Sequence, residues 1–124
     1  MKVAVTSQGP DFHSQVDPRF GRAWYFVIVD TDSGGFTAYD NTKNVDAVQG
    51  AGIQAARAVV DLGVAAVITG NVGPKAFATL QAGNVKVYPG ASGTVKEALE
   101  KFKTGQLQPA GKANVEGHWA QESP

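Results

Sequence analysis

Residues 64–76 (VAAVITGNVGPKA) constrain the fold of this chain most strongly. The segment begins with a short apolar run, the pattern of a strand that is buried on both faces of a parallel sheet. A loop with two glycines follows, and then Pro74, which suits the first turn of a helix because the N–H that it lacks would have had no partner there. We therefore predict a strand, a glycine-rich turn and a helix from Pro74 to about Ala82. The N–H groups at the start of such a helix favour an anion.

Three further strands and a turn are expected in the first forty residues of the chain. Lys2–Ser7 and residues 24–31 are β-rich, and the turn at residues 32–35 leads back to a short, edge-like strand at Phe36–Asp40. Residues 41–48 are expected to form a loop. This part of the chain therefore predicts an antiparallel meander.

The remaining elements alternate between helix and strand. Residues 49–62 have apolar side chains at helical spacing, and Gly63 is expected to end this helix. Residues 85–88 predict another short buried strand. Thr94 and Glu97 have the spacing of a capping box, which begins a helix that continues to about Lys103. The element order predicts an α/β fold in which a five-stranded mixed sheet has helices on its faces.

The length of the chain favours one domain followed by a tail. The 124 residues can form one modest core but are too few for two. From Thr104 onward the sequence is rich in Gly, Gln, Pro and Ala and has little periodicity. We therefore predict a domain over residues 1–104 and a mobile C-terminal tail over residues 105–124, in which Trp119 stands out as a large apolar residue.

Composition excludes several kinds of partner and site. Eleven Lys and Arg residues balance eleven Asp and Glu residues, which argues against a general attraction to nucleic acid or to a membrane surface. The absence of cysteine excludes disulfides, thiol nucleophiles and cysteine-ligated zinc or iron–sulfur sites. No apolar run approaches the ~20 residues of a membrane span, and no signal peptide is visible. We therefore expect a cytoplasmic protein.

Several glycine-rich loops should meet at one edge of the predicted sheet. Ligands of open α/β sheets lie beyond the carboxyl ends of parallel strands, where the strand order reverses. The loops after the first strand, at residues 69–73 and at residues 89–93, should all end there. We expect a pocket of helix N-termini whose donors come from Gly70, Asn71, Gly73, Ser92, Gly93 and Thr94. The alternative is that these glycines serve only turns and helix caps.

Arginine and histidine side chains offer further candidate contacts. Arg19 and Arg22 lie in one loop, where their guanidinium groups would give forked donors to an anion, or alternatively form surface ion pairs around a buried Phe20. His13 and His118 are the only histidines, and His13 is the candidate metal ligand, with simple exposure as the alternative. No pair of His and Glu residues has metal-ligand spacing, so a metal cage built by the protein alone is not expected.

The sequence contains no pattern that indicates catalysis. A two-metal phosphoryl-transfer site needs several carboxylates at strand ends, and the first strand has none. No histidine is placed by the sequence beside Ser7, Ser92 or Thr94, so a hydrolase triad is unsupported. We therefore predict a binding protein and not an enzyme.

Four motifs occur in an order that resembles one protein family: residues 17–23 (DPRFGRA), 50–56 (GAGIQAA), 70–76 (GNVGPKA) and 90–95 (GASGTV). They closely resemble the dinitrogenase iron–molybdenum cofactor biosynthesis family. That family includes NifX-like and NafY-like carriers, the C-terminal part of NifB-like proteins, and orange-protein-like members that hold a molybdenum–copper sulfide cluster. The resemblance covers about residues 2–107 and implies a ribonuclease-H-like fold with helices on both faces of the sheet.

The resemblance also implies a function related to nitrogen fixation. It implies a non-enzymatic carrier for an anionic metal–sulfur cluster that contains Mo with Fe or Cu, either an iron–molybdenum cofactor precursor or a molybdenum–copper sulfide cluster. Proteins that donate or accept the cluster would be its partners. Many relatives have a histidine at the position of Arg19, so charge pairing by Arg19 and Arg22 is the expected mode here. The alternative is a regulatory or protein-interaction module with a small-anion pocket and no cluster.

Overall fold

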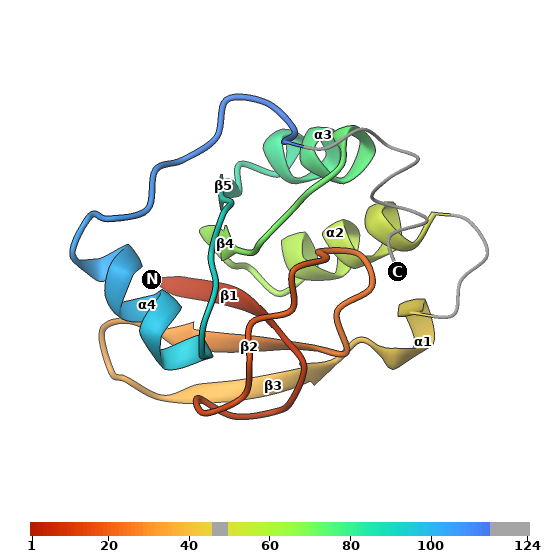
Figure 1. The fold of residues 1–124 in the computed structure, drawn as a ribbon. Helices are drawn as coiled ribbons and strands as arrows, with labels where there is room; N and C mark the ends of the chain where they lie inside the picture. Colours follow the sequence, from red (N-terminus) through yellow and green to blue (C-terminus); the bar gives the residue numbers. More distant parts are fainter. Residues whose placement is uncertain (46–49, 115–124) are drawn as a thin grey trace.

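The structure is a computed structural model that describes residues 1–45 and 50–114. One mixed sheet forms its centre, with the strand order β3-β2-β1-β4-β5 (Figure 1). The strands are β1 (Lys2–Ser7), β2 (Tyr25–Asp30), β3 (Phe36–Asp40), β4 (Ala66–Ile68) and β5 (Lys86–Tyr88). β1 pairs antiparallel with β2 and parallel with β4, and β4 pairs parallel with β5. The predicted α/β fold with a five-stranded mixed sheet is therefore confirmed.

Helices cover both faces of this sheet (Figure 1). They are α1 (Thr42–Val45), α2 (Ala51–Asp61), α3 (Pro74–Ala82) and α4 (Val95–Lys103). α2 and α3 pack together on the face that carries Phe26 and Val67, whereas α4 packs on the face that carries Val5 and Ile68. No helix among the described residues is both long and apolar enough to span a bilayer.

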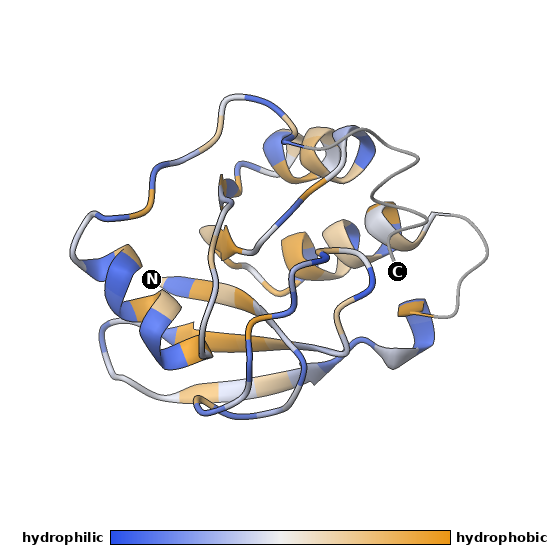
Figure 2. Ribbon diagram, in the orientation of Figure 1, coloured by the Kyte–Doolittle hydropathy of each residue, from blue (hydrophilic) through white to orange (hydrophobic). Residues whose placement is uncertain are grey.

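Two apolar clusters, one on each face of the sheet, form the core. Val59 of α2 and Leu80 of α3 are fully buried against one face, and Val95 of α4 is fully buried against the other. Figure 2 shows apolar residues along β1, β2 and β4, with hydrophilic residues on the outer sides of α3 and α4. Each large apolar side chain of these clusters stabilises the fold by roughly 1.5–3 kcal/mol when it is fully buried. Burial on both faces explains why β4 has three consecutive buried residues instead of an alternating pattern.

The predicted loop after β3 contains the short helix α1. The Asp40 carboxylate accepts a hydrogen bond from the Thr42 N–H at 2.8 Å, and the Asn44 N–H donates to the Asn41 carbonyl at 2.9 Å. These local bonds close a single helical turn. A single turn is too short for apolar residues to recur at helical spacing. Its polar composition therefore predicted a loop.

Residues 107–114, which belong to the predicted tail, contact the domain. Leu107 packs against the core on the α4 side, and Ala110 and Ala113 pack against the core on the α2–α3 side. The Ala110 N–H donates to the Val87 carbonyl of β5 at 2.8 Å. This contact joins two backbone groups and does not depend on which side chains are present. The side-chain pattern of the sequence therefore could not indicate it. The rest of the predicted tail, including His118 and Trp119, lies outside the described residues.

Candidate functional site

The carboxyl ends of β1, β4 and β5 meet at one edge of the sheet because these strands are parallel. The chain passes from β4 into α3 and from β5 into α4 at this edge, and α2 also begins there before it crosses back to β4 (Figure 1). Three helix N-termini therefore lie at one edge, two on one face of the sheet and one on the other. This is the arrangement expected from the order of the elements.

Residues 15–20 run across the same edge and lie between the two glycine-rich loops. On one side, the Asn71 N–H donates to the Pro18 carbonyl at 2.7 Å and the Phe20 N–H donates to the Asn71 carbonyl at 3.2 Å. On the other side, the Val16 N–H donates to the Gly93 carbonyl at 2.8 Å. The structure thus brings Arg19 and Asn71 together as bridge partners and places Ser92, Gly93 and Thr94 on the opposite side of residues 15–20.

Glycines at this edge allow backbone segments to approach each other closely. A Cβ atom on Gly70 would lie 2.7 Å from the Pro18 Cα, and one on Gly21 would lie 2.7 Å from the Gly52 Cα. The absent side chain of Gly70 therefore faces the protein's own backbone. A Cβ on Gly52 would lie 3.3 Å from the Ala76 Cβ, so the first turns of α2 and α3 are in contact. The glycines bring the loop of residues 18–22 and both helix starts into one cluster.

The N-terminus of α3 has no cap from a described side chain. Gly73 is the N-cap residue, with φ −82° and ψ 170°, and Pro74 occupies the start of the helix as predicted. Gly50 at the start of α2, with φ 76°, likewise provides no side-chain cap. Neither first turn contains an acidic residue. The partial positive charge of these two neighbouring helix ends is therefore not offset by a carboxylate in the helix itself.

The N-terminus of α4 is closed by its own side chains. The predicted capping box is present, because the Thr94 hydroxyl accepts from the Glu97 N–H at 3.1 Å and the Thr94 N–H donates to the Glu97 Oε1 at 3.0 Å. The hydrogen bond from the Thr94 N–H holds the pKa of Glu97 below its usual value. Gly93, at φ 82°, and the exposed Ser92 lie next to this box. Thr94 can donate to a ligand only if the box opens.

The two arginines are engaged by different parts of the molecule. The Arg19 Nε lies 3.8 Å from the Asp17 Oδ1, and the Arg19 N–H donates to the same oxygen at 3.0 Å. The Arg22 Nη1 donates to the Val45 carbonyl of α1 at 2.6 Å. Burial raises the pKa of Asp17, whose side chain is 1% exposed, and Arg19 offsets part of this rise. Both arginines have further interactions and neither is free.

His13 does not join the cluster at the sheet edge. It is exposed and lines a hollow of about 310 Å³ against α4, together with Lys96, Lys103 and Gly34 of the turn between β2 and β3. That turn lies toward the opposite edge of the sheet from Asn71. Across residues 1–45 and 50–114, no group of three or more His, Cys, Asp or Glu side chains could hold a metal ion.

Two asparagines that the sequence did not single out support the cluster. Asn41 is buried, and its Nδ2 donates to the Ala23 carbonyl at 2.8 Å and to the Gly21 carbonyl at 3.3 Å, which fixes the arginine loop. The Asn114 Oδ1 accepts from the Val72 N–H at 2.8 Å. No sequence signal indicated Asn114, because its partners lie more than forty residues away in a segment without periodicity.

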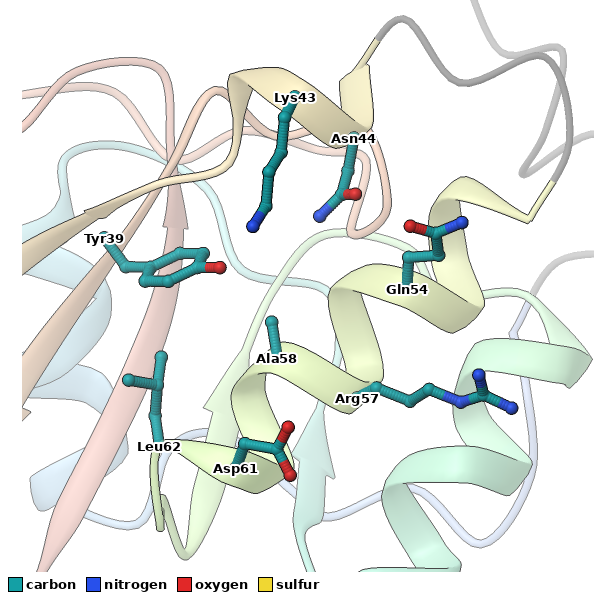
Figure 3. Close-up of a pocket in the computed structure, with 8 residues that line it drawn as sticks. All are labelled: Tyr39, Lys43, Asn44, Gln54, Arg57, Ala58, Asp61 and Leu62. Atoms are coloured by element: carbon teal, nitrogen blue, oxygen red, sulfur yellow. The ribbon is translucent and has the colours of Figure 1, made fainter.

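A second hollow, of about 370 Å³, lies between β3, α1 and α2. Figure 3 shows Lys43 and Asn44 pointing from α1 toward α2, with the Tyr39 ring beside Lys43, whereas the Arg57 side chain extends away from Lys43 and Asn44. None of the residues predicted for the site lines this hollow. It adjoins the candidate site through α2, whose first turn contributes Gln54 to the hollow, and through α1, whose Val45 carbonyl accepts a hydrogen bond from Arg22.

Comparison with known proteins places this geometry in a family. The family model described as dinitrogenase iron-molybdenum cofactor matches residues 1–105. The apo form of the orange protein from Desulfovibrio gigas is 41% identical, with a TM-score of 0.90 over 92% of this chain and 96% of that one. A NifB-like protein from Thermotoga is also 41% identical, with a TM-score of 0.81 over 94% of this chain and 98% of that one.

An uncharacterized protein from Methanocaldococcus jannaschii is 28% identical over 110 residues, which are 87% of this chain and 90% of the relative. These matches extend over nearly the whole length of each relative. With a family model that spans residues 1–105, the chain belongs to the dinitrogenase iron-molybdenum cofactor family.

Proposed function

We propose that this protein binds and carries an anionic metal–sulfur cluster, containing Mo with Fe or Cu, at the sheet edge where α2 and α3 begin. The observation that carries the proposal is the contact between two helix N-termini that have glycine N-caps and no acidic residue in their first turns. The family, and the 41% identity with the orange protein, support a cluster as the cargo. The same relationship supports a non-enzymatic, cytoplasmic, ribonuclease-H-like carrier with cluster-donating or cluster-accepting partners.

The donor set at this edge suits a cluster that is already complete. A sulfide-rich cluster carries its own metal ligands and presents negative charge to its surroundings. Each helix N-terminus favours such charge by about 0.3–1 kcal/mol when exposed and up to ~2 kcal/mol when partly buried. Weak contacts of this kind retain a cargo without covalent ligation. A carrier that must release its cluster to another protein benefits from this mode of binding.

Arg19 and Arg22 would add charge to the same cluster. Both belong to the loop whose Gly21 lies against the start of α2. Arg22 would have to exchange the Val45 carbonyl for the cargo, and Arg19 would have to act despite the nearby Asp17. These existing partners favour a second candidate function, a regulatory or interaction module in which the arginines are structural and the edge binds a small anion or nothing.

Metal analysis and a visible absorption spectrum of protein purified anaerobically from its native host test the proposal. Molybdenum with iron or copper, and sulfide-to-metal absorption bands, are expected. A colourless, metal-free protein that also fails to bind tetrathiomolybdate in a titration would instead support the interaction module.

Charge variants test the contribution of the arginines. The double variant Arg19→Gln with Arg22→Gln should lose most of its affinity for tetrathiomolybdate, and wild-type binding should weaken as salt rises, since exposed charges are screened over ~8–10 Å. Arg57→Gln is the matched control, because Arg57 is an exposed arginine of α2 that lies outside the arginine loop. Equal affinity in all three proteins would show that the arginine loop is not the site.

Gly73→Ala tests the floor of the site. Its φ of −82° suits any residue, so the change should leave stability unchanged or raise it by about 0.4–1 kcal/mol through the unfolded chain. A methyl group at the entrance of α3 should nevertheless weaken cluster binding. Intact binding in a stable variant would place the cargo elsewhere.

A further inference from the structure

We infer that Asn114 is a positioning residue that holds the loop between β4 and α3 in its binding conformation. The inference rests on the proposed function, and it assigns part of the site to a segment beyond residue 105, where the family model ends. Asn114 itself is exposed and lies outside every motif that the sequence identified. Within the described part of the chain, however, its hydrogen bonds are with the loop that leads into α3.

One side chain joins three consecutive residues of this loop. The Asn114 Oδ1 accepts from the Val72 N–H at 2.8 Å. Its Nδ2 donates to the Gly70 carbonyl at 3.2 Å and to the Asn71 Oδ1 at 3.1 Å. The Asn114 backbone N–H also donates to the Val72 carbonyl at 3.3 Å. A side-chain amide offers two N–H donors and an acceptor oxygen on separate atoms, so the residue type matches the contacts.

The loop needs this support because its own sequence is permissive. Gly70 and Gly73 flank Asn71 and Val72, and glycine imposes little on the backbone. The Pro18 carbonyl and the Phe20 N–H hold one side of the loop through Asn71. Asn114 holds it through Gly70 and Val72, so the loop is restrained by two segments that are distant in sequence.

The chain leading to Asn114 is itself anchored. Ala113 packs against the core, and the Ala110 N–H is bonded to the Val87 carbonyl of β5. This anchoring lowers the entropy that Asn114 loses when it binds the loop. A loop that is already ordered loses less conformational entropy when the cargo binds, so the cargo binds more tightly.

Amide hydrogen exchange on the full chain tests the positioning step without any cargo. The Val72 N–H should exchange about tenfold faster in Asn114→Ala than in wild type, because it loses its acceptor. The N–H groups of Val67 and Leu80, in the centre of the fold, should be unchanged. Gln108→Ala is the matched control, since Gln108 lies in the same segment and its Nε2 donates to the Gly105 carbonyl, away from the loop between β4 and α3. An unchanged Val72 rate in Asn114→Ala overturns the inference.

Titration with tetrathiomolybdate tests the consequence for binding. Asn114→Ala should bind about tenfold more weakly, which corresponds to ~1.4 kcal/mol, and Gln108→Ala should bind as wild type does. Asn114→Asp keeps the acceptor for Val72 but faces the Gly70 carbonyl and the Asn71 Oδ1 with a carboxylate, so it should bind more weakly still. Faster exchange with full affinity would reduce Asn114 to a structural role and overturn the inference. Failure of the wild-type protein to bind would refute the proposed function instead, while the exchange result would still report whether Asn114 orders the loop.

Discussion

The loops that follow β4 and β5 leave the same edge of the sheet, and each leads through glycines into a helix. They are also bonded to each other, since the Gly90 N–H donates to the Gly70 carbonyl at 2.9 Å. Their helix starts nevertheless differ. α4 begins with Thr94 and Glu97, which form hydrogen bonds with each other in a capping box. α3 begins with Gly73 and has no side-chain cap from the described residues.

The difference shows that glycine content and location do not by themselves make an anion site. Glu97 already supplies a carboxylate to the end of α4, so an external anion there would have to displace it. Nothing comparable is present in the first turn of α3, where Lys75 is the only charged residue. The two regions therefore differ in whether a carboxylate lies at the N-terminus of the helix, and not in the loop that precedes it.

The largest effect is expected from Gly70→Ala. Its Cβ would lie 2.7 Å from the Pro18 Cα and 2.8 Å from the Pro18 carbonyl oxygen, so backbone must move, at a cost of ~2–3 kcal/mol. Gly90→Ala in the companion loop is the control. It meets no atom within 4 Å but has φ 81°, which should cost about 1 kcal/mol. Urea denaturation measures both, and equal losses would mean that the two loops are packed alike.

Gly73→Asp should convert the open helix end into a closed one. The carboxylate would cap α3 as the Thr94 hydroxyl caps α4, with a negative charge added, and tetrathiomolybdate affinity should fall at least about tenfold while stability is kept or rises by a few tenths of a kcal/mol. Gly73→Ser provides the uncharged comparison, since it offers a cap without the charge. A titration in which the Asp variant binds like the Ser variant would remove charge as the reason for the difference.

Thr94→Ala should affect stability alone. Loss of the capping hydroxyl at α4 is expected to cost ~1 kcal/mol. The variant should retain wild-type affinity for tetrathiomolybdate if binding takes place at α3. Thermal melting and titration of the same sample measure the two effects. Weaker binding in a folded Thr94→Ala protein would transfer the site to α4.

Asp17→Asn should produce the smallest effect and the clearest dependence on pH. Burial raises the pKa of Asp17 above 3.8. Between pH 3.8 and this raised pKa, the folded protein retains a proton that the unfolded chain has released. Stability from this group is therefore present below pH 3.8 and is lost as pH rises through the raised pKa. Asp17→Asn should gain stability relative to wild type in that window and keep the gain at neutral pH. Denaturation at pH 4 and pH 7 measures the difference, and a gain that shrinks as pH rises would contradict it.

The same variant bears on the open end of α3. Asp17 places a negative charge beside Arg19, which is the bridge partner of Asn71. Its removal should tighten anion binding by only about twofold to fivefold, since the Arg19 side chain is 23% exposed and its charge is partly screened by solvent. No change in affinity would indicate that Arg19 does not contribute to binding.

The sequence by itself determined those features that depend on neighbouring residues. Pro74 marked the start of α3, the spacing of Thr94 and Glu97 marked the start of α4, and Gly63, at φ 75°, ended α2. Each is a local conformational preference, so it can be recognised in a few letters. The order of these elements then led to a mixed sheet, and four short motifs indicated the family.

Only the tertiary structure decided which groups meet. It paired Asp17 with Arg19 and the Val45 carbonyl with Arg22, placed His13 in a hollow against α4, and brought Asn114 to the loop at Gly70. Such contacts join segments that are far apart in sequence, and they arise only when helices and strands pack in one arrangement. A local pattern records what the backbone does at a position, whereas the partner of a side chain depends on the assembled fold.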